Sequence, residues 1–227
     1  MSRVEKCLVP GPGGLIELVM EAGERLEQSH PLVAVIAHPH PLYGGSMDNK
    51  VVTTLSRLYR QLGVDVLRFN FRGIGSSEGV HDEGRGEVDD MLAVVKYARQ
   101  QKPEARIILA GFSFGSAIAA AASEVLSSEN LACQHLLLVA PPVDRYQYAP
   151  GGAFTCPTCI VIGGLDDIVD ANTVADWVSA MAAPPRLVCI PEASHFFHGE
   201  LVTLKTKLET EILEMMTDFP GSEVNRE

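Results

Sequence analysis

The sequence lacks the features that mark several common protein classes. It has 18 lysine and arginine residues against 29 aspartate and glutamate residues, a formal net charge of -11, and its basic residues form no cluster. This balance argues against nucleic acid and anionic membrane surfaces as partners. No apolar run approaches the roughly 18 residues of a membrane span, and the first residues lack the apolar core of a signal peptide. We therefore expect a cytoplasmic protein that binds neither nucleic acid nor a membrane.

Cysteine is also scarce. Five cysteines at irregular spacing do not indicate a disulfide framework and are typical of a reducing compartment. Cys156 and Cys159 have the spacing of a redox motif, but they precede a strand-like run instead of opening a helix. No second Cys/His pair is present for zinc. We expect no metal site, and the sequence alone leaves open whether this pair has a redox role.

What the chain does contain is an alternation of apolar, strand-like runs with segments of helical periodicity. At 227 residues and 46% hydrophobic, it fits one domain, residues 1–219, with a core on both sides of a sheet and a polar tail, 220–227. The alternation predicts an α/β fold with a mostly parallel eight-stranded sheet and helices on both faces. The first two strands, separated by a Pro/Gly-rich turn, should form an antiparallel pair at one edge. The expected strands are residues 4–9, 15–20, 32–37, 64–71, 105–110, 136–140, 160–163 and 187–190, and the expected helices are 51–62, 88–98, 116–125, 171–182 and 198–219.

One segment, residues 111–115, has the G-x-S-x-G pattern of a nucleophile elbow. It follows an apolar run and precedes a run of small residues, so a buried strand is expected to turn sharply into a closely packed helix. Gly111 and Gly115 avoid the clashes that side chains would make at such a turn, which leaves Ser113 projecting at its tip. The N–H of Phe114 opens the helix and offers half of an oxyanion hole. The alternative is a surface serine in a glycine-rich turn.

A serine nucleophile requires a general base and an acid that orients it. His195 is the best candidate for the base, because it lies in the loop directly after the last expected strand, at the carboxyl edge where open α/β sheets bind ligands. Asp166 and Asp167 both follow an earlier strand, and either can supply the acid. The chain order Ser, Asp, His is the order of α/β hydrolases. Structural roles are expected for other histidines of loops and helix surfaces: His30, His81, His135 and His198.

These motifs together resemble the α/β-hydrolase superfamily, and the resemblance spans nearly the whole chain. It implies a single sheet with helices on both faces and acyl-transfer chemistry at the carboxyl edge. The motifs are H-x-x-x-x-x-G-G at residues 38–45, R-G-x-G-x-S at 72–77, G-x-S-x-G at 111–115, G-x-x-D at 163–166 and a histidine segment around 195.

More narrowly, residues 38–51 and 68–73 resemble a group of small, lidless bacterial hydrolases that is related to dienelactone hydrolases and often labelled serine aminopeptidase-like. Two positions depart from that pattern. Asn70 stands where many relatives have Asp, and Ala193 replaces the usual Gly before the histidine segment. Neither departure removes a group that the chemistry needs.

The resemblance also distinguishes between the two aspartates. Counting the G-x-x-D motif from Gly163 places the acid on Asp166. The apolar residues Ile168 and Val169 are expected to pack down on the sheet, which leaves Asp167 to face solvent or to cap the next helix.

The second oxyanion donor is expected in the loop after the third strand. Pro39 and Pro41 have no N–H, so the amide of His40 is the natural donor, with Leu42 or Tyr43 behind it. Leu42 and Tyr43 are also expected to line the substrate site. The His40 ring is expected to hold the shape of the loop, with a place in the site wall as the alternative.

The sequence thus predicts a serine hydrolase that cleaves a small ester-like molecule, a carboxylesterase, through Ser113, His195, Asp166 and the amides of Phe114 and His40. No cofactor is implied. Thioesterase or small-peptide hydrolase is the alternative with the same chemistry, and a hydrolase-fold binding protein without turnover is the alternative of another class. Residues 141–157 are too few for a helical cap, so we expect no cap domain and an open site. The physiological substrate and the oligomeric state stay open.

Overall fold

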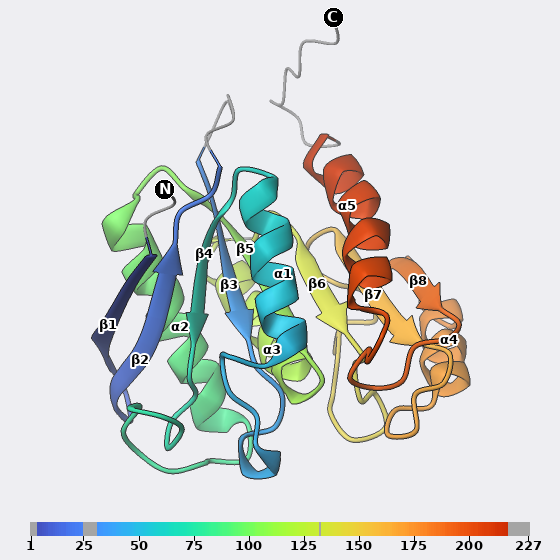
Figure 1. Ribbon diagram of the computed structural model, residues 1–227, viewed down its shortest axis with the longest axis horizontal. Coiled ribbons are helices and arrows are strands. Elements are labelled where there is room, and N and C mark those ends of the chain that lie inside the picture. The colour runs from blue at the N-terminus through green and yellow to red at the C-terminus, as the bar shows by residue number, and fades with distance from the viewer. Residues whose placement is uncertain (1–3, 25–30, 132, 218–227) are drawn as a thin grey trace, which may run out of the picture.

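The computed structural model describes residues 4–24, 31–131 and 133–217, and their strands form one eight-stranded sheet (Figure 1). The strand order is β1-β2-β4-β3-β5-β6-β7-β8. β2 pairs antiparallel with β1 and with β4, and all other neighbours are parallel. The predicted fold class and the antiparallel edge pair are therefore confirmed. The strands are β1 (Val4–Gly11), β2 (Gly14–Glu21), β3 (Leu32–Ala37), β4 (Asp65–Phe69), β5 (Arg106–Phe112), β6 (Leu136–Val139), β7 (Thr158–Gly163) and β8 (Arg186–Ile190).

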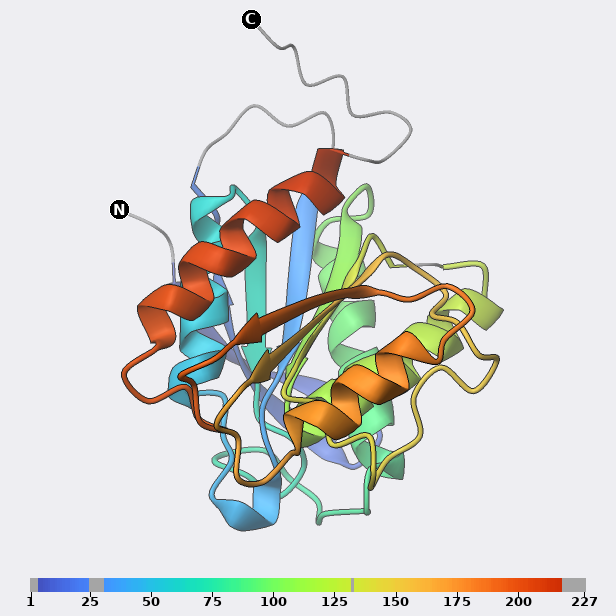
Figure 2. The same ribbon diagram turned by 90° about the vertical axis from the view of Figure 1, so that its right-hand side faces the viewer.

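Helices cover both faces of this sheet and enclose two separate hydrophobic cores. Residues of α1 and α5 belong to one core, and residues of α2, α3 and α4 belong to the other. In Figure 2 the red α5 and the cyan α1 lie on the opposite side of the sheet from the orange α4. The helices are α1 (Lys50–Gln61), α2 (Arg85–Gln101), α3 (Phe114–Ser128), α4 (Ala171–Ser179) and α5 (Leu201–Thr217), and a short 3₁₀ turn, η1 (Pro41–Tyr43), precedes α1.

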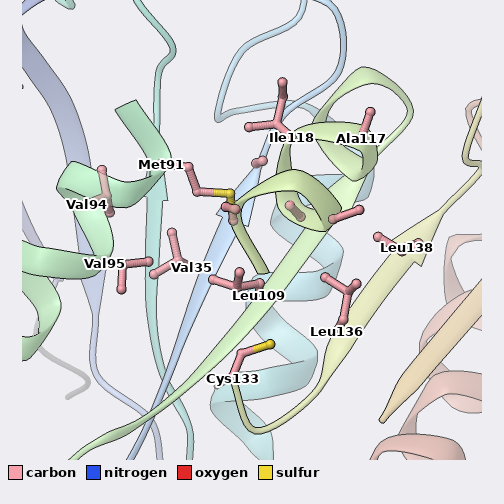
Figure 3. Packing of buried hydrophobic residues seen from close by; sticks show 14 of the residues in the cluster. Val35, Met91, Val94, Val95, Leu109, Ala117, Ile118, Cys133, Leu136 and Leu138 are labelled. Atoms are coloured by element: carbon pink, nitrogen blue, oxygen red, sulfur yellow. The ribbon is translucent and has the colours of Figure 1, made fainter. Parts of the chain in front are cut away.

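Helix α3 packs on the centre of the sheet, directly after the turn that follows β5. Figure 3 shows Ala117 and Ile118 of α3 in the same cluster as Leu109 of β5 and Met91 of α2. These side chains are at most 4% exposed, and full burial of each large one stabilises the fold by about 1.5–3 kcal/mol. Because alanine is small, the helix can lie close to the strands. The β5–α3 turn thus lies between a strand and a helix that are both anchored in the same core.

Some helix ends differ from the sequence prediction. We expected the last helix to begin at His198, but it begins at Leu201, because residues 196–200 form turns and Phe197 adopts a positive φ of 53°. The helix expected over 171–182 ends at Ser179, with Ala180 as its C-cap. The predicted tail 220–227 and His30 lie outside the described residues. No helix within the described ranges is long and apolar enough to cross a membrane.

Candidate active site

Ser113 occupies a strained turn between the end of β5 and the start of α3. Its backbone angles are φ 53° and ψ -120°, a region that residues with a side chain rarely adopt and that costs roughly 1–3 kcal/mol. The turn is tight: a Cβ added to Gly111 would lie 2.0 Å from the carbonyl oxygen of Gly115, and one added to Gly115 would lie 2.5 Å from that of Ala37. Glycine is therefore required at both places. The surrounding packing holds the Ser113 side chain out at the carboxyl edge of the sheet.

The structure brings Ser113, His195 and Asp166 into one hydrogen-bonded line. Nε2 of His195 lies 3.1 Å from Oγ of Ser113, and Nδ1 of His195 lies 2.8 Å from Oδ2 of Asp166. The His195 and Asp166 side chains are only 3% and 2% exposed. An ionised carboxylate can only accept hydrogen bonds, so the proton of the neutral ring belongs on Nδ1. Nε2 is then left with a lone pair that can accept the Ser113 proton.

Asp166 is itself held in place by the turn after β7. Its other oxygen, Oδ1, accepts the backbone N–H groups of Ile168 at 2.9 Å and Val169 at 2.8 Å. These two bonds leave Oδ2 facing the His195 ring. Asp167, the alternative acid, is exposed to solvent. The structure thus places Asp166, and not Asp167, beside the histidine.

Ile168 is not where the sequence analysis put it. We expected it to pack on the sheet with Val169, and Val169 does so at 3% exposed, whereas Ile168 is 39% exposed and lines the cavity beside Ser113. The reason is the pair of bonds to Asp166, which turns the chain so that only the second of the two apolar side chains points inward.

His38 braces the loop after β3. Nδ1 donates to the carbonyl oxygen of Pro39 at 2.6 Å, and Nε2 accepts the N–H of Phe71 at 3.1 Å. Burial lowers the pKa of His38 to about 4, so the ring is neutral at physiological pH and can make both bonds. No peptide bond among the described residues is cis. In a trans peptide C=O and N–H point in opposite directions, so fixing the Pro39 carbonyl against His38 turns the His40 N–H the other way.

The N–H groups of His40 and Phe114 are the two amides that the sequence analysis predicted to stabilise an oxyanion. Neither donates a hydrogen bond to another described residue. Phe114 is the first residue of α3, where an N–H has no partner within the helix. The His40 carbonyl, by contrast, accepts from the N–H groups of Tyr43 and Gly45, each at 3.1 Å, which stiffens the loop.

The ring of His40 lies in a cluster that the sequence analysis did not foresee. Its Nδ1 accepts the N–H of Leu42 at 3.3 Å, and its centroid lies 4.9 Å from that of Phe114 and 5.1 Å from that of His81. Burial, and next the charge of His81, lowers the pKa of His40. His81 in turn lies 2.7 Å from a carboxylate oxygen of the fully buried Glu87. The sequence offered one clue to this cluster. His81 lies in the long connection after β4, which runs at the same carboxyl edge of the sheet as the loop that carries His40.

A cavity of about 410 Å³ opens beside Ser113. Tyr43 lines it, as expected. Leu42 does not: its side chain is 68% exposed, because the turn that directs its N–H to the His40 ring points the side chain into solvent. The lining residues come from loops after four parallel strands and from the β5–α3 turn: Pro39, His40, Tyr43, Gly44, Gly45, Asn49, Ser113, Phe114, Pro142, Arg145, Tyr146, Ile168, His195 and Phe196.

No cap covers this cavity. Residues 140–157, where a cap helix would enter, contain turns and bends with no helix or strand. Within the described residues, no group of three or more His, Cys, Asp or Glu side chains is placed to hold a metal ion.

The cysteines of the redox-like motif do not face each other. Cys156 lies with its sulfur 2.9 Å from that of Cys133, whereas Cys159 points into the core on the opposite face of the sheet. Cys159 is a buried residue of β7, whereas Cys156 precedes that strand and packs with Cys133.

Comparison with known proteins identifies the family. Residues 40–144 match the family described as the alpha/beta hydrolase fold. A structure from Xanthomonas campestris, described as a serine hydrolase without lid, superposes with a TM-score of 0.87 at 35% identity, covering 96% of this chain and 97% of that one. The chain belongs to the α/β-hydrolase superfamily, and within it to the small lidless group.

Two further relatives of this hydrolase match it over most of their length. An alpha-beta serine hydrolase homologue from Coxiella burnetii superposes with a TM-score of 0.84 at 39% identity, covering 92% of this chain and 97% of that one. An uncharacterised protein of Rickettsia prowazekii is 35% identical over 220 residues, which cover 92% of this chain and 89% of the relative.

Proposed function

We propose that this hydrolase is a carboxylesterase that cleaves small esters through an acyl-enzyme on Ser113. The observation that carries the proposal is the hydrogen-bonded line from Ser113 through His195 to Asp166 at the wall of an open cavity. The strained backbone of Ser113 supports its role as the nucleophile. The similarity of the chain to a lidless serine hydrolase supports the same role.

In the proposed reaction, Oγ of Ser113 attacks the ester carbonyl, and Nε2 of His195 takes the proton of the Ser113 hydroxyl. The Asp166 carboxylate stabilises the charged imidazolium without accepting its proton. The N–H groups of Phe114 and His40 are the proposed donors to the oxyanion of the tetrahedral intermediate. His195 then protonates the departing alcohol, and water repeats the sequence to release the acid and regenerate Ser113.

Covalent labelling tests the nucleophile directly. A fluorophosphonate probe should add to Ser113 of the wild-type protein, located by mass spectrometry of the modified peptide, and Ser113→Ala should stay unlabelled. A wild-type protein that resists the probe and hydrolyses nothing would instead be a hydrolase-fold binding protein.

The class of scissile bond requires a second experiment, because esters, thioesters and amides share this chemistry. An acetyl 4-nitrophenyl ester, an acetyl 4-nitrothiophenyl ester and an aminoacyl 4-nitroanilide, which release matched chromophores, should be compared by kcat/KM. We expect the esters to be the best substrates. A preference for thioesters or aminoacyl amides would keep the nucleophile and replace the carboxylesterase assignment.

A further inference from the structure

The charge of the cavity wall is opposite to that of the whole protein. The chain has a formal net charge of -11, yet no aspartate or glutamate lines the cavity among the described residues. Arg145 does line it, and among the described residues it is the one permanently charged side chain in that wall. An anionic group approaching Ser113 therefore meets a cation at the site, although the protein as a whole repels it.

Arg145 is held at the cavity by the neighbouring loop. Its Nη2 donates to the carbonyl oxygen of Ile168 at 3.0 Å, which links the β6–β7 loop to the turn that carries Asp166. Its Nε lies 3.5 Å from Asp144, whose side chain is 54% exposed and does not line the cavity. No other described residue accepts from the guanidinium. A planar group with five N–H donors thus keeps donors free for a ligand.

The other polar residues of the wall add hydrogen-bonding groups without an opposing charge. Tyr43, Asn49 and Tyr146 line the same cavity. A tyrosine hydroxyl is already protonated at neutral pH, and burial raises the pKa of Tyr146 further. The described wall therefore offers hydrogen bonds to a carboxylate and presents no carboxylate of its own.

We propose that the ester substrate of this hydrolase carries a carboxylate, in either its acyl or its alcohol part, and that the Arg145 guanidinium binds it. This inference rests on the proposed function, because it concerns the same cavity. Arg145 acts as a specificity-determining residue and takes no part in the proton transfers. Its side chain is 54% exposed, so water and salt weaken the pair, and we expect a preference of about tenfold.

The test uses pairs of esters in which a carboxylate is replaced by a neutral carboxamide of similar size. For the acyl side, mono-4-nitrophenyl glutarate is compared with 4-nitrophenyl glutaramate, with non-enzymatic hydrolysis subtracted. For the alcohol side, 4-acetoxybenzoate is compared with 4-acetoxybenzamide. In at least one pair the wild-type protein should favour the carboxylate about tenfold in kcat/KM, and the preference should shrink as NaCl is raised.

Variants then assign the preference to one side chain. Arg145→Gln should abolish or reverse this preference, measured as the ratio of kcat/KM for the two members of a pair, so that a general loss of activity cancels. Arg145→Lys should keep part of the preference. Arg57→Gln is the matched control, because Arg57 is an exposed residue of α1 and its loss changes the net charge equally. That variant should retain the wild-type preference. Thermal melts of each variant establish that it is folded.

Three outcomes are decisive. Equal kcat/KM for both members of both pairs would overturn the proposal, and so would a preference that survives in Arg145→Gln. If no ester is hydrolysed and Ser113 resists the fluorophosphonate, the proposed function fails instead, and the two failures are thereby told apart.

Discussion

Through Nε2, the buried ring of His38 accepts the backbone N–H of Phe71 at 3.1 Å, and this bond ties the loop after β3 to the end of β4. The same ring fixes the Pro39 carbonyl and with it the direction of the His40 N–H. The orientation of a proposed oxyanion donor therefore depends on a side chain that does not itself line the cavity.

His38→Ala should lower kcat by about 10- to 100-fold and change KM much less. A misdirected His40 N–H weakens stabilisation of the transition state and leaves substrate binding almost unchanged. The measurement is steady-state kinetics on folded protein, together with the affinity for a trifluoromethyl ketone analogue, which should fall in parallel. Leu42→Ala, in the same loop but exposed, is the control and should behave like wild type. An unchanged kcat in His38→Ala would separate His38 from the oxyanion donor.

Ser113 and His195 are expected to act as one unit. Ser113→Ala and His195→Ala should each reduce turnover by about 10⁴- to 10⁶-fold, and the double variant should be little worse than either. Turnover of an activated ester at high enzyme concentration measures all three. Losses that multiply in the double variant would mean that the two residues work independently.

Asp166→Asn should lose about 10⁴-fold in kcat, because an amide beside Nδ1 favours the wrong imidazole tautomer. Asp167→Asn should cost less than tenfold, since that side chain faces solvent. Kinetics on the two purified variants, each checked by circular dichroism, decide between them. The reverse order of effects would move the role of the acid to Asp167.

Acyl chains longer than a few carbons should bring little gain. The cavity of about 410 Å³ has no cap, so a long chain cannot be enclosed, although each buried CH₂ would be worth roughly 0.8 kcal/mol. kcat/KM measured from acetyl through dodecanoyl esters should level off early. A steady rise along the series would reveal an acyl-binding groove beyond this cavity.

Stability should fall as the pH drops from about 6.5 toward 4. Burial lowers the pKa of His38 to about 4 and that of His135 to about 3, so in this range the unfolded chain binds protons that the folded protein does not. Each ring should reduce the free energy of unfolding by about 1.4 kcal/mol per pH unit. Urea denaturation of wild type and His135→Gln at pH 6.5, 5.5 and 4.5 checks this, and the variant should lose less stability over that span. Equal losses would show that His135 takes up a proton as readily in the folded protein as in the unfolded chain.

The sequence analysis could predict those features that depend on local pattern. Buried parallel strands appear as continuous apolar runs, so β3 was predicted at its observed bounds. The G-x-S-x-G turn is set by sterics within a few residues, and the loops holding Asp166 and His195 follow directly from strand ends. Those three residues could therefore be named together before their distances were known.

Side-chain direction in long loops was beyond the same reasoning. Leu42 and Ile168 were each assigned the wrong surroundings, because hydrogen bonds to His40 and to Asp166 decide where they point. Arg145 reaches the cavity only through tertiary packing of the β6–β7 loop on the Ile168 turn. No spacing rule in the sequence encodes such a contact.

Part of the cavity wall lies outside the two cores, and this bears on how such a protein can change over generations. Tyr43, Arg145, Ile168 and Phe196 line the cavity but belong to neither core cluster. Replacing them one at a time should alter which molecule is recognised and should cost the fold little stability. A duplicated gene could in this way acquire a new substrate in small steps, while the strained serine turn and the packing of α3 on β5 are inherited unchanged.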